Sequence, residues 1–148
     1  MDRSPLGRIL ALDVGKRRIG IALSDPLGIT AQGLPTLERR KTHEDYAALT
    51  ELACEREVVL ILVGNPIGMA GQDTHMAGFV RHFADGLAQR SGLPVRLWDE
   101  RLTTVQAGRV LRSSGIGIEK RARAVDRLSA VLLLQNYLDS MGAMEASE

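Results

Sequence analysis

The run Val58-Val59-Leu60-Ile61-Leu62-Val63 constrains the fold of this chain more than any other segment. It is continuously apolar, mostly β-branched, and stops at Gly64-Asn65-Pro66. A strand with this pattern is covered on both faces, which is typical of parallel strands in a sheet with helices on each side. We therefore expect an α/β protein in which residues 58–63 form the central parallel strand.

The N-terminal part of the chain predicts antiparallel strands. Residues 8–14 and 19–24 are short apolar runs separated by Gly15-Lys16-Arg17-Arg18, a pattern that indicates a hairpin with a basic tip. Residues 29–34 lie between two prolines and predict a third extended segment. Three antiparallel strands therefore precede the parallel ones.

Helical periodicity and capping residues predict the remaining elements. Thr42 is the expected N-cap of a first helix over residues 43–56, and residues 73–90 form a second. Residues 95–99 are the last strand, followed by a helix from Thr103 or Thr104 to Arg112, a final helix over 124–140, and a frayed tail over 141–148. This order predicts one mixed sheet flanked by helices, with ligand sites at the carboxyl ends of the parallel strands.

Size and composition narrow the class of protein. At 148 residues the chain has the size of one domain, so residues 1–148 are expected to form a single unit. The single cysteine, Cys54, excludes an intramolecular disulfide, and we expect it to be a small buried hydrophobe. No apolar run is long enough for a secretory signal or a membrane span, which predicts a cytoplasmic protein without a membrane partner.

Three acidic residues stand where an expected strand ends or a helix begins. Asp13 closes the first strand, Glu100 follows the last one, and Asp126 opens the final helix. Carboxylates gathered in one cleft repel each other unless cations neutralise them. They therefore predict a site for Mg²⁺ or Mn²⁺, with two ions expected, and Asp99 and Asp25 are further candidates. Each acid taken alone is also compatible with ordinary capping.

Basic residues near these acids predict contacts with phosphates. The formal net charge is only +1, so attraction to nucleic acid has to come from local charge. Solvated surface charge is the alternative. Aromatic residues make up 3% of the chain, which favours recognition of backbone shape over base stacking. The candidate nucleic-acid-binding residues are Lys16, Arg17, Arg18, Arg101, Arg109, Arg112, Lys120, Arg121 and Arg123.

The glycine-containing segment 113–118 directly precedes these last basic residues. It predicts either a flap over the substrate or a plain connection between helices.

Three segments resemble the YqgF family, and the resemblance covers residues 8–139. The most specific is Asp99-Glu100-Arg101-Leu102-Thr103-Thr104; the others are the stretch from Asp13 to Asp25, and Lys120 with the helix that starts at Asp126. This chain departs from the family at Ser129, where Ala is usual. It also has Asn65 where the family commonly has Leu before the proline, which affects the loop and not the acids.

The resemblance implies a ribonuclease H-like fold, related to the RuvC-type Holliday junction resolvases. It also implies a nuclease that acts on the precursor of small-subunit ribosomal RNA. By the same resemblance, Asp13, Glu100 and Asp126 are the catalytic acids that bind the metal ions.

Several alternatives stay open at this point. A Holliday junction resolvase would need two active sites related by two-fold symmetry, and hence a dimer. The sequence leaves open whether the protein is a monomer or a homodimer. The first hairpin also resembles that of actin-like and sugar-kinase ATPases, but those proteins need two lobes and this chain has the length of one. A non-catalytic RNA-binding assembly factor is the third alternative. The choices between structured RNA and branched DNA, and between endo- and exonuclease, also remain.

Overall fold

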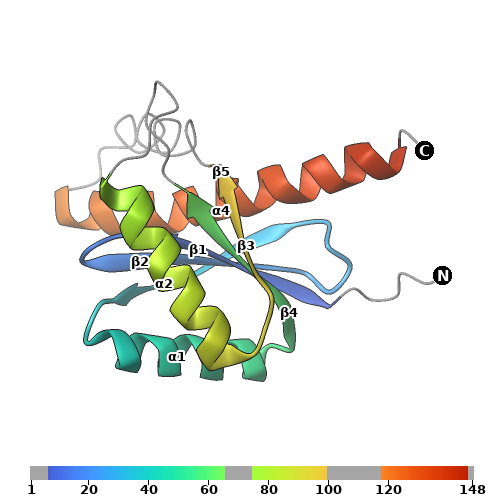
Figure 1. The fold of residues 1–148 in the computed structure, drawn as a ribbon. Coiled ribbons are helices and arrows are strands. Elements are labelled where there is room, and N and C mark those ends of the chain that lie inside the picture. Colours follow the sequence, from blue (N-terminus) through green and yellow to red (C-terminus); the bar gives the residue numbers. More distant parts are fainter. Residues whose placement is uncertain (1–6, 66–74, 100–117, 147–148) are drawn as a thin grey trace.

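The structure is a computed structural model that describes residues 7–65, 75–99 and 118–146. The described elements follow the order predicted from the sequence (Figure 1). In chain order they are β1 (Arg8–Val14), β2 (Arg18–Ser24), β3 (Ala31–Glu38), α1 (Thr42–Glu55), β4 (Val58–Asn65), α2 (His75–Ser91), β5 (Val95–Asp99) and α4 (Ile118–Ala146).

The strands form one five-stranded sheet in the order β3-β2-β1-β4-β5. β1 pairs with β2, and β2 with β3, in antiparallel fashion, whereas β1–β4 and β4–β5 are parallel pairs. β4 is thus the middle one of the three parallel strands, as its apolar run predicted. β1 is the middle strand of the whole sheet, with an antiparallel neighbour on one side and a parallel neighbour on the other.

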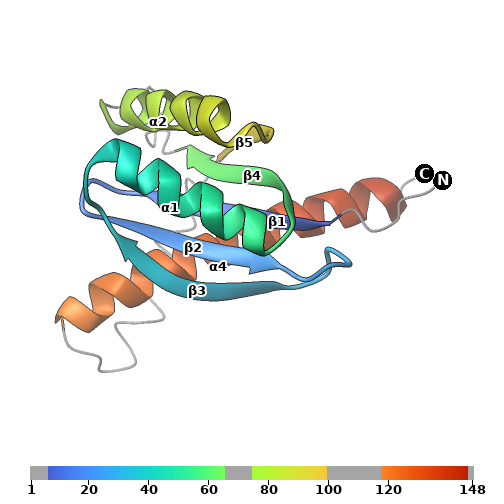
Figure 2. The ribbon, with the colours of Figure 1, turned by 90° about the horizontal axis from the view of Figure 1, so that it is seen from below.

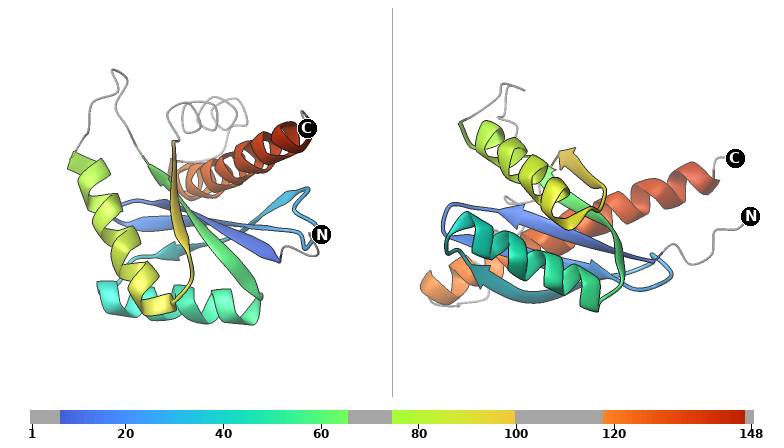
Figure 3. Two further views of the ribbon diagram at one scale, coloured as in Figure 1. Left: turned by 45° about the vertical axis from the view of Figure 1, so that its right-hand side comes forward. Right: turned by 60° about the horizontal axis from the view of Figure 1, so that its bottom comes forward.

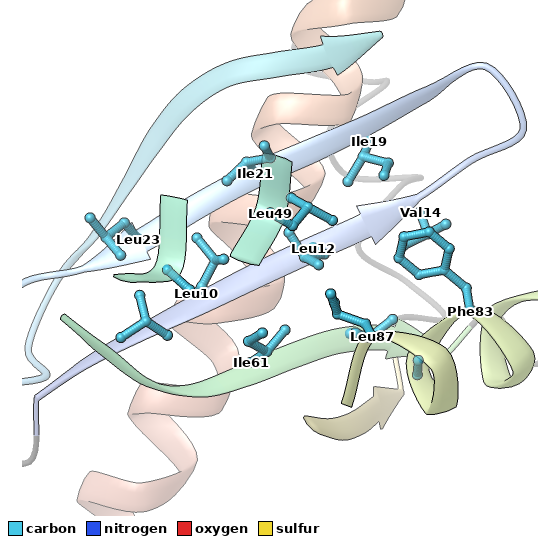
Figure 4. Close-up of a cluster of buried hydrophobic side chains, with 14 of the residues drawn as sticks. Leu10, Leu12, Val14, Ile19, Ile21, Leu23, Leu49, Ile61, Phe83 and Leu87 are labelled. Carbon is cyan, nitrogen blue, oxygen red and sulfur yellow. The ribbon is translucent and has the colours of Figure 1, made fainter. Parts of the chain in front are cut away.

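Helices cover both faces of the sheet. Helices α1 and α2 lie on one face, and the long helix α4 crosses the other, as Figures 2 and 3 show. Large aliphatic residues fill the layer under α1 and α2, including Leu10, Leu12, Ile61 and Leu87 (Figure 4). A second cluster joins the sheet to α4 and consists of Ala11, Ala22, Leu62, Ala130, Leu133, Leu134, Tyr137 and Leu138.

Strand β3 differs most from its predicted position, residues 29–34. It runs from Ala31 to Glu38 and includes Pro35, which was expected to end it. Proline lacks the N–H that a central strand needs, so it is tolerated where a strand has no neighbour on one side. β3 is such an edge strand, and its pairing with β2 shifts register beside the proline, between Ile19 and Ile21.

Two helices also differ from their predicted limits. The N-cap of α1 is Lys41, whose backbone N–H donates to the Glu44 carboxylate, and not Thr42. Helix α4 begins before and ends after the predicted 124–140, because it continues from Ile118 to Ala146. The expectation that Cys54 is buried was wrong, because its side chain is exposed on α1.

None of the helices in the described ranges is both long and apolar enough to cross a membrane. The predicted helix ending at Arg112 and the segment 113–117 lie outside the described residues.

Candidate active site

Asp13 lies at the carboxyl end of the middle strand, on the face that α4 covers. Its neighbours Leu12 and Val14 belong to the core under α1 and α2, whereas Ala11 belongs to the cluster beneath α4. Because side chains alternate along a strand, the half-buried Asp13 faces α4. Its register partner on β2 is Gly20, which is buried and has no side chain to occupy the space beside the carboxylate.

Contacts with β3 fix the direction in which α4 crosses the sheet. Near the middle of α4, Gln135 accepts a hydrogen bond from the Ala31 N–H (3.3 Å) and donates one to the Ile29 carbonyl (3.2 Å). Two turns earlier, the side chain of Arg127 lies directly over Gly33. Going toward its N-terminus, α4 therefore moves along β3 from Ala31 to Gly33.

The register of the strands shows where this part of α4 lies relative to Asp13. Gly33 pairs with Ala22, which pairs with Ala11, so the backbone at Arg127 lies level with the middle of β1. Asp126 directly precedes Arg127, and the helix there continues toward the carboxyl end of β1. The topology thus brings the α4 backbone at Asp126 to the end of the sheet where Asp13 lies.

Helix α4 packs on the face of the sheet to which Asp13 points. Ala130 and Leu133 are both fully buried in the cluster between α4 and the sheet. The backbone of α4 at position 126 therefore lies at the same end, and on the same face, of the sheet as Asp13.

Glu100 lies outside the described residues, so the structure does not place the third predicted acid. The strand before it, β5, is parallel to β4, and Asp99 is the register partner of Asn65. β4 is in turn parallel to β1, where Val63 is the register partner of Leu12. The carboxyl ends of β1, β4 and β5 therefore lie at the same end of the sheet. Glu100 directly follows β5 in sequence.

The proposal of Asp25 as a further member of the acidic site was wrong. It follows the carboxyl end of β2, which is antiparallel to β1, so it lies at the opposite end of the sheet from Asp13. Its carboxylate accepts hydrogen bonds from the backbone N–H groups of Ile29 (2.7 Å), Thr30 (2.8 Å) and Leu27 (3.3 Å). These bonds, that from Thr30 foremost, hold the pKa of Asp25 below its usual value, and its role is to shape the β2–β3 loop.

The tip of the first hairpin is basic, as predicted. Lys16 and Arg17 are exposed and Arg18 is half-buried. The turn closes with a hydrogen bond from the Gly15 N–H to the Arg18 carbonyl (2.9 Å), and a Cβ on Gly15 would lie 3.0 Å from that oxygen. Glycine serves close approach here and not a positive φ, which the structure reserves for Gly7, Gly28 and Gly92 among the described glycines.

The other predicted phosphate contacts are only partly placed. Arg101, Arg109 and Arg112 lie outside the described residues. Lys120, Arg121 and Arg123 belong to the first turns of α4, before Asp126.

Two buried polar atoms near this end of the sheet were not expected from the sequence. Ser129 is fully buried on α4, one turn after Asp126, and its hydroxyl has no hydrogen-bond partner among the described residues. Asn65, at the end of β4, has a buried side-chain oxygen that also lacks a partner in the described part of the chain. Unpaired buried polar groups are rare and costly. At both positions the YqgF family usually has an apolar residue, and this departure was the only feature of the sequence that could have drawn attention to them.

The side chains that the structure describes include no cluster of three or more His, Cys, Asp or Glu residues placed to hold a metal ion. The side chains of Glu100 and Asp126 are not among them, so the predicted three-acid site is not tested by this result. What the residues offer is carboxylate oxygen at Asp13, an acidic position on α4 and the orphaned Ser129 hydroxyl. Oxygen donors of this kind suit hard divalent cations.

Comparison with known proteins gives close relatives over nearly the whole chain. The family model RuvX, described as Holliday junction resolvase, matches residues 7–140. A Koribacter versatilis protein named "Putative pre-16S rRNA nuclease" is 54% identical over 136 residues, covering 92% of this chain and 89% of the relative. A protein of the same name from Moorella thermoacetica is 49% identical over 135 residues, covering 91% and 96%.

Solved structures share the fold at low sequence identity. The Thermus thermophilus RuvC in complex with a Holliday junction substrate has a TM-score of 0.56 and 16% identity, over 92% of this chain and 96% of that one. A Fowlpox virus resolvase, solved with its Holliday junction DNA, has a TM-score of 0.57 and 12% identity, over 90% and 98%. These likenesses confirm the ribonuclease H-like fold. The family model and the curated relatives go further, and on their evidence the chain belongs to the RuvX family, the YqgF-type group that its motifs indicated.

Proposed function

We propose that this protein is a divalent-metal-dependent nuclease that processes the 5′ end of pre-16S rRNA during ribosome assembly in the cytoplasm. The names of its relatives support the RNA substrate. The observation that carries the catalytic part is the convergence of Asp13 and the Asp126 segment of α4 at one end and on one face of the sheet.

Asp13, Glu100 and Asp126 are the residues that would hold the metal, as Mg²⁺ or Mn²⁺ and with two ions expected. When bound, such ions lower the pKa of water and neutralise charge on a leaving oxygen. The donor set fits, because hard cations prefer carboxylate oxygens and three clustered carboxylates need neutralisation.

The chain itself contributes rigidity and access. Asp13 lies on the middle strand, which pairs with β2 at Asp13 itself and with β4 as far as Leu12, so its backbone is held in the sheet. Gly20, the register partner of Asp13 on β2, places no side chain beside the carboxylate. Lys16 and Arg17, exposed at the next turn, bind flanking phosphates without reading sequence.

The test is cleavage of precursor rRNA by the purified protein with Mg²⁺ or Mn²⁺. Wild-type protein should cut, whereas Asp13→Asn, Glu100→Gln and Asp126→Asn should bind RNA without cutting it. Asp85→Asn is the matched control, because Asp85 is an exposed carboxylate on α2, across the sheet from the site. Equal cleavage by Asp13→Asn and wild type would refute the site.

A Holliday junction resolvase is the second candidate, favoured by the description of the family model. This activity requires two active sites facing the two strands of a four-way junction, and hence a symmetric dimer. Paired nicks in four-way DNA junctions, together with a dimer mass by light scattering, would support it. A monomer that ignores such junctions would exclude it.

A non-catalytic assembly factor is the outcome at the other extreme. Such a protein would bind RNA without metal, and Asp13→Asn would support ribosome maturation as well as wild type does. Complementation of a depleted strain by Asp13→Asn therefore separates this function from the nuclease.

A further inference from the structure

We propose that four exposed cations, Lys16, Arg17, Arg40 and Lys41, form a single phosphate-binding surface, the basic ridge. The ridge holds the nucleic-acid backbone where it leaves the active site. Sequence reasoning assigned Lys16 and Arg17 to nucleic acid but gave no role to Arg40 or Lys41. This inference rests on the proposed nuclease function and extends it to a substrate contact outside the acidic site.

The ridge brings together two segments that are separate in sequence. Lys16 and Arg17 form the tip of the β1–β2 hairpin, and Arg40 and Lys41 connect β3 to α1. The backbone N–H of Arg39 donates to the carbonyl of Arg17 at 2.9 Å. The two basic pairs are therefore neighbours in the folded chain.

A buried arginine fixes the hairpin tip from beneath. The Arg39 guanidinium donates through Nε to Asp45 (2.9 Å) and through Nη1 to the carbonyl of Gly15 (3.2 Å). It also lies over two aromatic rings of α2, with its Cζ 5.4 Å from the ring centroid of Phe79 and 5.0 Å from that of Phe83. Arg39 thus ties the turn after Asp13 to the α1 and α2 layer.

The same ion pair fixes the second segment of the ridge. Asp45 accepts a hydrogen bond from the Arg40 backbone N–H (3.0 Å) with its other oxygen, and Glu44 accepts one from Lys41 N–H (3.3 Å). The side chains of Arg39 and Asp45 are only 9% and 2% exposed. Arg39 is consequently a positioning residue whose charge is already matched, whereas the four ridge cations face solvent.

Charge and composition indicate what the ridge binds. The exposed acids beside it are Glu38 and Glu44, which leave an excess of two positive charges, with His43 also exposed. Glu38 is the register partner of Arg18 at the base of the hairpin. The ridge segments contain no aromatic residue on which a base could stack, so the partner that fits is a phosphodiester backbone.

The position of the ridge relates it to the cut site. Lys16 follows Asp13 by three residues, and an extended chain rises about 3.3 Å per residue, so their backbones are at most about 10 Å apart. Phosphates on the ridge are therefore close neighbours of the one that is cut. A backbone held there passes from the α4 face, around the hairpin tip, toward the start of α1.

The experiment compares two double variants that each remove two positive charges. Arg40→Ala/Lys41→Ala removes half of the ridge. Arg56→Ala/Arg90→Ala is the control, because both arginines are exposed and Arg56 follows the far end of α1, about 20 Å from Lys41 at 1.5 Å per residue. Binding to duplex RNA, single-stranded RNA and four-way DNA junctions is measured by fluorescence anisotropy over a series of salt concentrations.

For the ridge variant, the slope of log Kobs against log salt should flatten by about 1.8 on a duplex, because each lost phosphate contact contributes about 0.9. The control slope should stay at the wild-type value. In cleavage assays, the loss should appear in KM rather than in kcat. A second double variant, Lys16→Ala/Arg17→Ala, is made alone and in combination with Arg40→Ala/Lys41→Ala. If the four cations act as one surface, the loss of binding free energy in the combined variant should differ from the sum of the two separate losses.

The outcomes separate the ridge from the nuclease. Wild-type slopes for Arg40→Ala/Lys41→Ala, or equal losses in both double variants, overturn the ridge even if RNA is cut. A protein that binds nucleic acid through the ridge but never cuts it contradicts the nuclease and leaves the ridge intact. RNA and junction DNA with equal slope changes identify the shared phosphate backbone as the ligand.

Discussion

The two faces of the sheet are built from different kinds of residue, although the same strands supply both. On the face covered by α1 and α2, the strands present leucine, isoleucine and valine. On the face covered by α4, strands β1 and β2 present the small residues Ala11, Gly20 and Ala22. Small residues on these two strands let the helix approach the sheet closely. On β1 and β2, one face therefore supplies the large apolar packing, and the other carries the carboxylate of Asp13 beneath α4. Leu12 and Asp13 are adjacent in sequence and lie on opposite sides of this division.

The largest expected effect is on activity, at Asp13. Asp13→Asn removes the charge of the proposed metal ligand with little change in side-chain volume, and the fall in kcat/KM should exceed about a hundredfold, since even outer-shell changes at metal sites cost 10–100-fold. The free energy of unfolding in urea should change less than it does for the neighbouring Leu12→Ala, because Asp13 is only half-buried. A variant that keeps its activity but loses stability would reverse the roles assigned to the two faces.

The next residue back, Leu12, should show the opposite pattern. It is fully buried among large side chains, and Leu12→Ala should lower the free energy of unfolding by about 2–5 kcal/mol. Cleavage per folded molecule, measured well below the unfolding midpoint, should stay close to wild type. A loss of activity as large as that of Asp13→Asn would show that the two faces are coupled.

Two glycines of α2 test how tightly the α1 and α2 layer is packed. A Cβ on Gly86 would collide with the ring of Tyr46, whose hydroxyl donates to the Phe83 carbonyl at 3.0 Å, whereas a Cβ on Gly78 would meet no described atom within 4 Å. Gly86→Ala should therefore destabilise by about 1–3 kcal/mol. Gly78→Ala should stabilise by up to about 1 kcal/mol, through helix propensity alone. Thermal unfolding of both variants checks the pair, and equal effects would contradict the close packing of Tyr46.

The smallest effect concerns Asp25, at the end of the sheet away from the site. Backbone N–H groups, that of Thr30 foremost, hold its pKa below 3.8, so its contribution to stability is complete above pH 3.8 and is lost as the pH falls through the lowered value. Asp25→Asn should remove this part of the acid dependence without affecting cleavage. Urea unfolding between pH 2 and pH 7, in steps of about one unit, measures it; an unchanged acid profile would contradict the assignment.

Local sequence signals predicted the strands well and the edge of the sheet poorly. The limits of β1 and β5 agree with the sequence, because alternation and apolar runs are properties of the segment itself. β3 was misplaced because the tolerance of Pro35 depends on having no neighbour beyond it, which only the assembled sheet decides. α4 is longer than predicted because its ends are rich in helix-forming residues, such as Glu119 and Lys120, that carry no apolar stripe.

The candidate site could be predicted only as far as each residue's place on its own element. Asp13 and Glu100 were predicted from the rule that sites gather at the carboxyl ends of parallel strands, and Asp126 from its place at the start of the final helix and from the family resemblance. Adding Asp25 to these acids was wrong, because β2 runs in the opposite direction to β1. Arg39 and Asp45 were missed because their role depends on contacts among the hairpin, α1 and α2. No pattern within one segment records such contacts.

Pro35 has a consequence for how two copies of this protein could associate. An open edge strand invites pairing with the same strand of another molecule, which would run one continuous sheet through both. The exposed proline offers no N–H, and the register shift beside it bends β3 away from a regular ladder. Pairing of two copies through β3 is accordingly disfavoured, and this edge of the sheet is protected against uncontrolled joining of sheets.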